Sequence, residues 1–319
     1  MLSKIYRVLW LTFFYFICSI NMTHALPDAK ITVSVVGEDG KTIEGAEVGI
    51  GFERNIGFGT DSTPQKGITS SNGIFTASYS TSGYVTYGAV KEGYYRSIGV
   101  FRFFEQKMGR WEPWNPTINV VLRKREKPVP MYARDTQMSR LEIPVSGKAV
   151  GFDLTEYDWV APYGKGKYAD FFFKLDRKFN KDDDFESILT ITFSNKYDGI
   201  QLVKENRRYG SEFKLPRLAP RTGYKQKLTR LRKGEPNKPI GSDFAEDNNY
   251  IFRVRSEEKD GKLLRAMYGK IQGDIQVEPR GRKTATILFT YYLNPDYSQN
   301  LEYGGNLFTN LSDTEQVGL

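Results

Sequence analysis

The chain has 319 residues, of which 39% are hydrophobic, 14% aromatic and 26% charged, which excludes a disordered or collagen-like protein. Its 46 basic and 38 acidic residues give a net charge of +8. The one Cys and the one His, Cys18 and His24, both lie in the first 25 residues. A chain without that segment has no disulfide, no thiolate or imidazole zinc site and no Ser-His-Asp or Cys-His nucleophile.

Residues 1–25 are predicted to be a signal peptide. Lys4 and Arg7 precede an apolar run at residues 8–20, and Thr23 and Ala25 then place small residues at the two positions that a signal peptidase reads. This run is shorter than the ~20 residues that cross a bilayer, so we expect cleavage after Ala25 rather than an uncleaved membrane anchor. The prediction is export to the periplasm, the cell surface or the extracellular space.

The next segment, residues 28–124, is predicted to form a first β-sandwich. Ile31, Val33 and Val35 alternate with polar residues, which is typical of a half-buried strand. Asp39-Gly40 follows as a hairpin turn, because Gly adopts positive φ without steric cost.

A linker is predicted at residues 125–140, where a charged run leads into Pro128 and Pro130. Residues 141–310 repeat the alternating pattern and are predicted to be a second β-rich domain, followed by a tail at 311–319. Only residues 131–140 and 226–232 resemble short helices, and neither has a good capping signal. The predicted fold class is therefore mainly β, with two tandem antiparallel β-sandwich domains after the signal peptide.

Three segments of the first domain resemble carboxypeptidase regulatory-like domains. Residues 43–48 read I-x-G-A-x-V, residues 67–75 contain T-x-x-x-G-x-F, and residues 90–94 contain K-x-G-Y. The segments occur in the family's order, although Thr42 stands where the family often has proline. The resemblance covers residues 28–124 and implies a transthyretin-like β-sandwich without catalytic activity of its own.

One loop of the second domain, residues 153–170, mixes carboxylates, aromatic residues and lysines. The functional interpretation is a carbohydrate site in which aromatic rings stack on sugars and polar groups bind hydroxyls. The alternative is a loop whose aromatic residues cover the end of the core, which is the more common arrangement. The candidate ligand-binding residues are Asp158, Trp159, Tyr163, Lys165 and Lys167.

Two further groups of residues are candidate binding sites. Trp111 and Trp114 could bind carbohydrate or pack against the second domain. The basic stretch 214–238 could bind an anionic surface, with a solvated loop as the alternative. Its candidate anion-binding residues are Arg217, Arg221, Lys225, Lys227, Arg230, Arg232 and Lys233.

The leading functional hypothesis is a non-enzymatic exported structural or ligand-binding protein of the cell envelope. The expected partner is a polysaccharide or another envelope component, with peripheral membrane contact also considered; nucleic acid, cofactors and metals are not expected. The alternative hypothesis is a carbohydrate-active hydrolase that uses paired carboxylates. Its candidate acids are Asp153, Glu156, Asp158 and Asp170.

Overall fold

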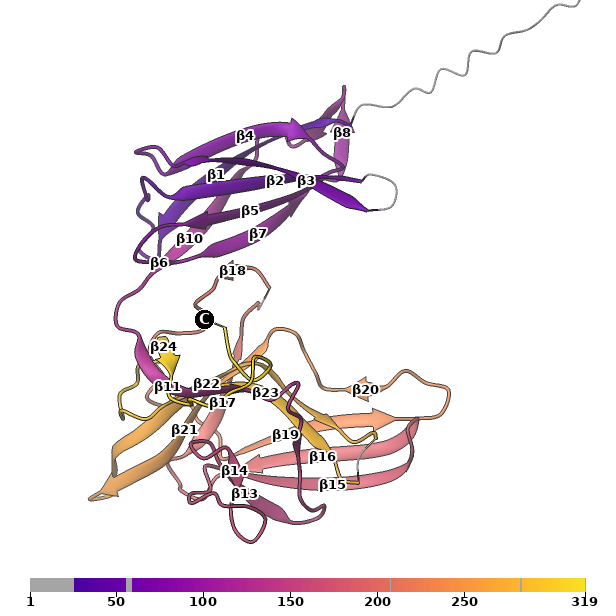
Figure 1. Cartoon of the computed structure of the whole chain (residues 1–319), viewed down its shortest axis with the longest axis vertical. Helices are drawn as coiled ribbons and strands as arrows, with labels where there is room; N and C mark the ends of the chain where they lie inside the picture. The colour runs from indigo at the N-terminus through magenta and orange to yellow at the C-terminus, as the bar shows by residue number, and fades with distance from the viewer. Residues whose placement is uncertain (1–25, 56–58, 207, 282, 319) are drawn as a thin grey trace, which may run out of the picture.

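The computed structural model describes residues 26–55, 59–206, 208–281 and 283–318, so the predicted signal peptide with Cys18 and His24 lies outside the described residues. Throughout these ranges the regular elements are β-strands. No helix there is long and apolar enough to span a membrane. The strands form four sheets that pack as two sandwiches, one above the other in Figure 1. The predicted mainly β class is confirmed.

The first sandwich spans β1 to β10 and receives one strand from the second half of the chain. One sheet has the order β6-β10-β1-β9-β8, with β4 also paired to β1. The other sheet has the order β18-β7-β5-β2-β3. Their bounds are β1 (Asp28–Gly37), β4 (Ile74–Ser80), β6 (Tyr94–Tyr95), β8 (Glu105–Lys107), β9 (Arg110–Glu112) and β10 (Thr117–Lys124) in the first sheet, and β2 (Glu47–Asn55), β3 (Thr60–Ile68), β5 (Tyr84–Val90), β7 (Ser97–Arg102) and β18 (Gly210–Ser211) in the second.

Period-two alternation explains the core of the first sandwich. Ile31, Val33 and Val35 on β1 are fully buried, as their alternation predicts, and Val48 and Ile50 on β2 face them from the other sheet. Most strand pairs are antiparallel, but β1 pairs with β10 in parallel. Each strand therefore presents one face to this core and the other to the outside.

The second sandwich is larger. One sheet has the order β17-β21-β22-β23-β11-β24, with β12 paired to β23, and the other has the order β14-β13-β15-β16-β19-β20. Their bounds are β11 (Val129–Asp135), β12 (Leu141–Glu142), β17 (Gly199–Lys204), β21 (Asn248–Lys259), β22 (Lys262–Glu278), β23 (Thr286–Asn294) and β24 (Tyr303–Asn306) in the first, and β13 (Ala149–Asp153), β14 (Asp158–Trp159), β15 (Phe171–Lys181), β16 (Asp184–Thr192), β19 (Lys227–Gly234) and β20 (Gly241–Ser242) in the second. Aromatic rings dominate the core between them, where Phe171 packs edge-on against Phe173 and Phe252.

One local prediction is wrong, and two segments that resembled short helices are strands. Residues 125–140 are not only a linker, because they include β11, which pairs with β23 and buries Met131 and Ala133 completely. Pro130 is tolerated because it lies where the register between β11 and β24 shifts. The segments 131–140 and 226–232 are not helices, since they contribute to β11 and β19, which pair with distant strands.

The two sandwiches are joined by backbone and side-chain contacts. β18, from the second half of the chain, pairs with β7 of the first sandwich, and the Glu212 amide donates to the Arg96 carbonyl at 2.8 Å. Glu302 is fully buried at the junction, where its carboxylate accepts hydrogen bonds from the Tyr95 hydroxyl at 3.0 Å and from two backbone amides of residues 126 and 127 at 2.9 Å each. Arg217 completes the site with an ion pair to Glu302 at 2.7 Å.

Candidate functional site

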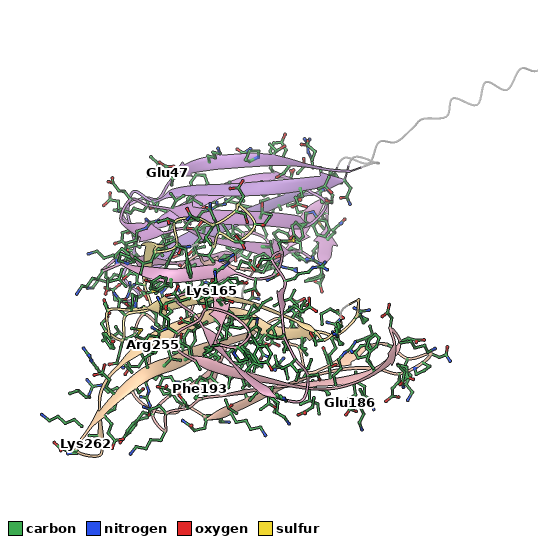
Figure 2. All side chains as sticks on the ribbon, turned by 60° about the horizontal axis from the view of Figure 1, so that its bottom comes forward. Glu47, Lys165, Glu186, Phe193, Arg255 and Lys262 are labelled. Atoms are coloured by element: carbon green, nitrogen blue, oxygen red, sulfur yellow. The ribbon has the colours of Figure 1, made fainter. Side chains whose placement is uncertain are left out.

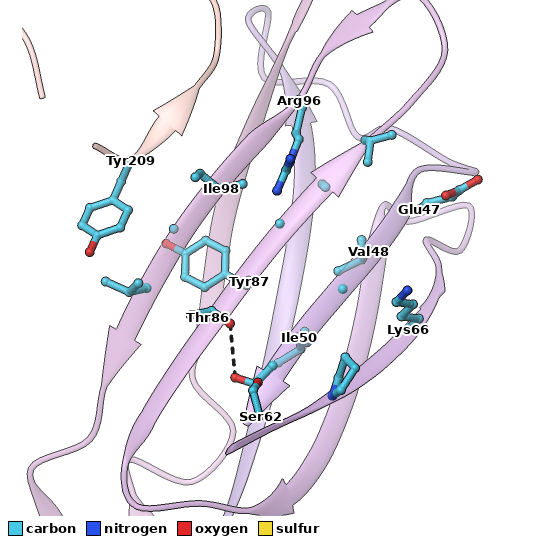
Figure 3. Close-up of a pocket in the computed structure, with 18 of the residues that line it drawn as sticks. Glu47, Val48, Ile50, Ser62, Lys66, Thr86, Tyr87, Arg96, Ile98 and Tyr209 are labelled. Carbon is cyan, nitrogen blue, oxygen red and sulfur yellow. Dashed lines mark hydrogen bonds between the residues drawn. The ribbon is translucent and has the colours of Figure 1, made fainter. Parts of the chain in front are cut away.

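A long open groove lies on the outer face of the sheet β18-β7-β5-β2-β3 (Figure 3). Its volume is about 1050 Å³, which is at the upper end of the range for ligand-binding pockets. Most of its lining belongs to the first sandwich, and Arg208 and Tyr209 come from the second half of the chain. The groove is therefore built from both parts of the protein.

Glycines form the floor of this groove. Since Val48 and Ile50 point into the core, the residues that alternate with them, Gly49 and Gly51, face outward. On the neighbouring strand Gly88 lies directly opposite Gly49. A Cβ atom placed on Gly49 would meet no atom within 4 Å, so the missing side chain leaves empty space above the sheet.

Side chains on the flanking strands form the walls. On β3, Pro64 and Lys66 line one side, as Figure 3 shows for Lys66. Ile98 on β7 lines the other side and is 38% exposed. Ile68 and Val90 are 66% and 44% exposed at the same cavity, so the groove offers apolar surface to a ligand.

The loop before β18 closes one side of the groove. The Lys214 ammonium donates to the Tyr209 carbonyl at 2.6 Å, and Gly210 pairs with Ile98, so the loop is attached at two points. Tyr84 and Tyr209 both line this wall, and a side-chain hydrogen bond with Tyr209 raises the pKa of Tyr84. The Arg102 guanidinium lies 5.0 Å from the centre of the Tyr84 ring.

The charge around the groove is predominantly positive. Lys66, Arg96 and Arg208 line it, against the single carboxylate of Glu47. All four side chains are exposed. Among the residues that the structure describes, none of the three cations forms an ion pair, so their charge is available to a ligand.

The predicted carbohydrate loop does not converge on this groove. Trp159 is buried in the second core, where its ring packs edge-on against Phe152 and Phe173. Asp158 accepts hydrogen bonds from the backbone amides of Trp159 and Lys165, both at 2.8 Å, and so shapes the loop. This arrangement corresponds to the alternative interpretation, in which aromatic residues cover the core.

The remaining residues of that loop lie at the surface. Tyr163 is 41% exposed and Lys165 is also exposed. Lys167 forms an ion pair with Glu156. None of them contributes to the lining of the groove.

The predicted acid cluster is organised around Arg255, which lies on the second sandwich in Figure 2. The Arg255 guanidinium bonds Asp170 at 2.7 Å and Asp153 at 2.9 Å, and both carboxylates are fully buried. Burial alone raises the pKa of Asp153, but hydrogen bonds from the Tyr168 backbone and from other amides outweigh it and lower that pKa to about 2. Burial raises the pKa of Asp170 despite the adjacent guanidinium. The two acids therefore share one cation instead of facing each other across a cavity.

The two tryptophans predicted as a binding site lie in different environments. Trp111 is buried in the core of its own sandwich, where its indole N–H donates to the Thr81 carbonyl at 2.9 Å and its ring covers Gly83. Trp114 is 37% exposed, with Arg110 4.8 Å from its ring centre. The alternative of packing against the second domain is wrong for Trp111.

The basic stretch 214–238 is not a single cationic surface, because acidic side chains pair with four of its seven candidate residues. Arg230 pairs with the buried Asp274, and Arg217 with Glu302. The other pairs join Arg232 to Glu278 and Lys233 to Glu235. Arg221, Lys225 and Lys227 are exposed. In the described ranges no group of three or more His, Cys, Asp or Glu residues could hold a metal ion.

Comparisons with known proteins do not show a family for this chain. No family model matches the chain, and no curated protein matches it either. The resemblance at residues 28–124 therefore stays a prediction. Two solved structures are similar at 9% sequence identity. The shaft pilin SpaA from Lactobacillus rhamnosus GG, crystallised as a point mutant, has a TM-score of 0.22, with 88% of this chain and 96% of that chain covered. BcpA, the major pilin subunit of Bacillus cereus, has a TM-score of 0.23, with 86% and 99% covered.

Proposed function

We propose that the chain is a non-enzymatic exported binding protein whose ligand lies in the groove floored by Gly49 and Gly88. The observation that carries the proposal is the glycine floor between two rows of exposed side chains. A floor without side chains admits a ligand that lies flat along the strands. Because the groove is open at the surface, an extended chain fits it better than a small enclosed molecule does.

The proposed ligand is an acidic glycan chain. Tyr84 and Tyr209 place aromatic rings at one wall, and aromatic rings pack well against the apolar faces of sugars. Lys66, Arg96 and Arg208 supply donors for carboxylate or sulfate groups, and Arg binds a carboxylate through two parallel hydrogen bonds. This ligand class uses both the rings and the excess positive charge.

A second candidate ligand is an extended peptide with apolar side chains. The exposed Ile68, Val90 and Ile98 favour it, because a peptide could bury these side chains between its own. The two candidate ligands are distinguished by whether the groove binds acidic oligosaccharides or peptides with apolar side chains.

The contacts of the acid cluster support a non-enzymatic role. Asp153 and Asp170 are committed to Arg255, and Glu156 is paired with Lys167. Asp158 holds the backbone of its own loop. A glycoside hydrolase needs two carboxyl groups on either side of the scissile bond, and these four carboxylates are engaged in stabilising the loop.

Gly49→Leu is expected to abolish ligand binding without disturbing the fold. The leucine side chain would occupy the groove floor, where a Cβ meets no other atom, and residue 49 lies in an extended strand. We expect the affinity for an acidic oligosaccharide, first identified on a glycan array, to fall at least about tenfold. Titration calorimetry measures the affinity, and thermal unfolding verifies that stability is retained.

Gly305→Leu is the matched control, because Gly305 also lies in a strand with open space at its Cβ position but far from the groove. It should bind as the unchanged protein does. Equal affinity of Gly49→Leu and the unchanged protein would refute the groove as the site. Binding of peptides but no glycans, again lost in Gly49→Leu, would favour the second candidate ligand.

A further inference from the structure

A second exposed feature lies at the end of the first sandwich, far from the groove loop and from the second sandwich (Figure 1). The hairpin β8–β9 projects there, and every residue from 104 to 110 is exposed. Phe104 and Met108 are 85% and 94% exposed, the highest values for large apolar side chains within the described ranges. Met108 lies in the turn with φ of 49°, a left-handed conformation that is uncommon for residues other than glycine.

Cationic side chains lie beside the turn of this hairpin, and anionic side chains lie at its other end. Lys107 lies directly opposite Arg110 beside the turn, and Glu105 lies opposite Glu112 at the other end. Like charges at opposite positions destabilise a strand pair, whereas opposite charges would stabilise it. The hairpin thus places two cations beside an exposed methionine at its tip, and Asp28 of β1 lies on the other side of Arg110.

The hairpin is also beside the start of the described chain. The Asp28 amide donates to the Gly109 carbonyl at 3.1 Å, so the first strand begins next to the turn. The apolar run at residues 8–20 ends eight residues earlier, which is at most about 30 Å of extended chain. Until the expected cleavage after Ala25, a membrane that receives the apolar run is therefore within reach of this end of the sandwich.

We propose that the β8–β9 hairpin is a membrane-docking tip that places Met108 and Phe104 against an anionic phospholipid bilayer. Lys107 and Arg110 contact the lipid phosphates, while the apolar side chains enter the headgroup region. Trp114, whose ring lies against Arg110, is well placed at the same boundary, since tryptophan favours membrane–water interfaces. The tip keeps the protein at the membrane with the second sandwich directed away from it.

The experiment measures co-sedimentation of the chain beginning at Leu26 with vesicles of phosphatidylglycerol and phosphatidylethanolamine, and with vesicles of phosphatidylcholine alone. We expect binding to the anionic vesicles that weakens as salt rises. Lys107→Glu should weaken it about tenfold or more, because a cation near the lipid surface is replaced by an anion. The same substitution should leave thermal stability unchanged or slightly raised, since it creates an opposite-charge pair with Arg110.

The β21–β22 turn offers a matched control. There Lys259 lies opposite Lys262 beside a tight turn, but Asp260 with φ of 52° takes the place of the exposed methionine. Lys262→Glu therefore makes the same change in charge and in pairing at a polar turn (Figure 2). It should leave vesicle binding within about twofold of the unchanged protein.

The apolar contribution is tested with the double variant Phe104→Asn and Met108→Asn. It should lose most vesicle binding, whereas Met138→Asn with Leu264→Asn, at side chains 72% and 59% exposed elsewhere, should not. Absence of binding to anionic vesicles would overturn the proposal. Equal losses in the tip and control variants would also overturn it, as would unchanged binding of the double variant at the tip.

Discussion

Arg255→Met is expected to destabilise the protein by about 3–5 kcal/mol at pH 7, which is typical for removing one partner from a buried ion pair. The Arg255 guanidinium is bonded to both Asp153 and Asp170, whose side chains are fully buried. Methionine fills a similar volume but leaves two carboxylates without their cation. The measurement is the free energy of unfolding from urea denaturation of the unchanged and variant proteins.

The loss of stability in Arg255→Met is expected to become smaller as pH falls. Burial already raises the pKa of Asp170, and loss of the guanidinium raises it further, so in the variant the folded state takes up a proton at this carboxylate at higher pH than the unfolded chain does. Stability of the variant then recovers relative to the unchanged protein as pH falls from 7 towards 4. A loss that is constant across this range would contradict the assignment of the effect to the two carboxylates.

Arg265→Met is the control for this experiment. Arg265 lies on the neighbouring strand β22 and pairs with Glu257, but both side chains are about half exposed. Exposed pairs contribute roughly 0–1 kcal/mol, so this variant should lose little stability. A similar loss in both variants would show that burial of the Arg255 cluster is not the cause.

Lys270→Met is expected to stabilise the protein by about 1–3 kcal/mol at pH 7, since replacing a buried charge by an apolar side chain of similar volume is often favourable. Lys270 is 1% exposed, and its ammonium lies 4.9 Å from the Phe213 ring centre and 4.8 Å from that of Tyr292. Burial, reinforced by the nearby Arg123, lowers the pKa of Lys270 from 10.5 to about 7.

This shift makes the stability of the unchanged protein depend on pH. Between pH 7 and pH 10.5 the unfolded chain keeps the proton on Lys270 and the folded chain releases it, so stability rises with pH across this window. Denaturation at pH 7, 8 and 9 should show the rise in the unchanged protein and a flatter profile in Lys270→Met. Lys262→Met, an exposed change on the same strand, should keep the rise. A variant less stable than the unchanged protein at pH 7 would contradict the prediction.

Local sequence patterns predicted the fold class because strand faces depend on neighbouring residues. Ile31, Val33 and Val35 indicate a buried face wherever the strand lies in the sheet. The prediction failed at Pro130, where the effect of a proline depends on its partner strand. The local pattern was also ambiguous at residues 226–232, whose pairing with β16 is set by residues about 40 positions away.

The groove could not be predicted, because its parts are distant in the sequence. Gly49 indicates an open groove floor only once Gly88 is known to lie beside it. Tyr209 reaches this surface through the pairing of β18 with β7. The number of free cations in the basic stretch 214–238 was overestimated for the same reason. Its cations are visible in the sequence, but the acids that pair with Arg217 and Arg230 lie 85 and 44 positions away.

The strand β18 has a consequence for the first half of the chain when it is produced alone. A gene fragment that encodes only residues up to Lys124 would yield a sheet whose β7 margin has lost its partner strand. Its bare amide and carbonyl groups would be open to pairing with foreign chains, a known route to aggregation. Removal of the second half therefore uncovers the edge of β7 at Ser97 and Ile98, which the full chain covers.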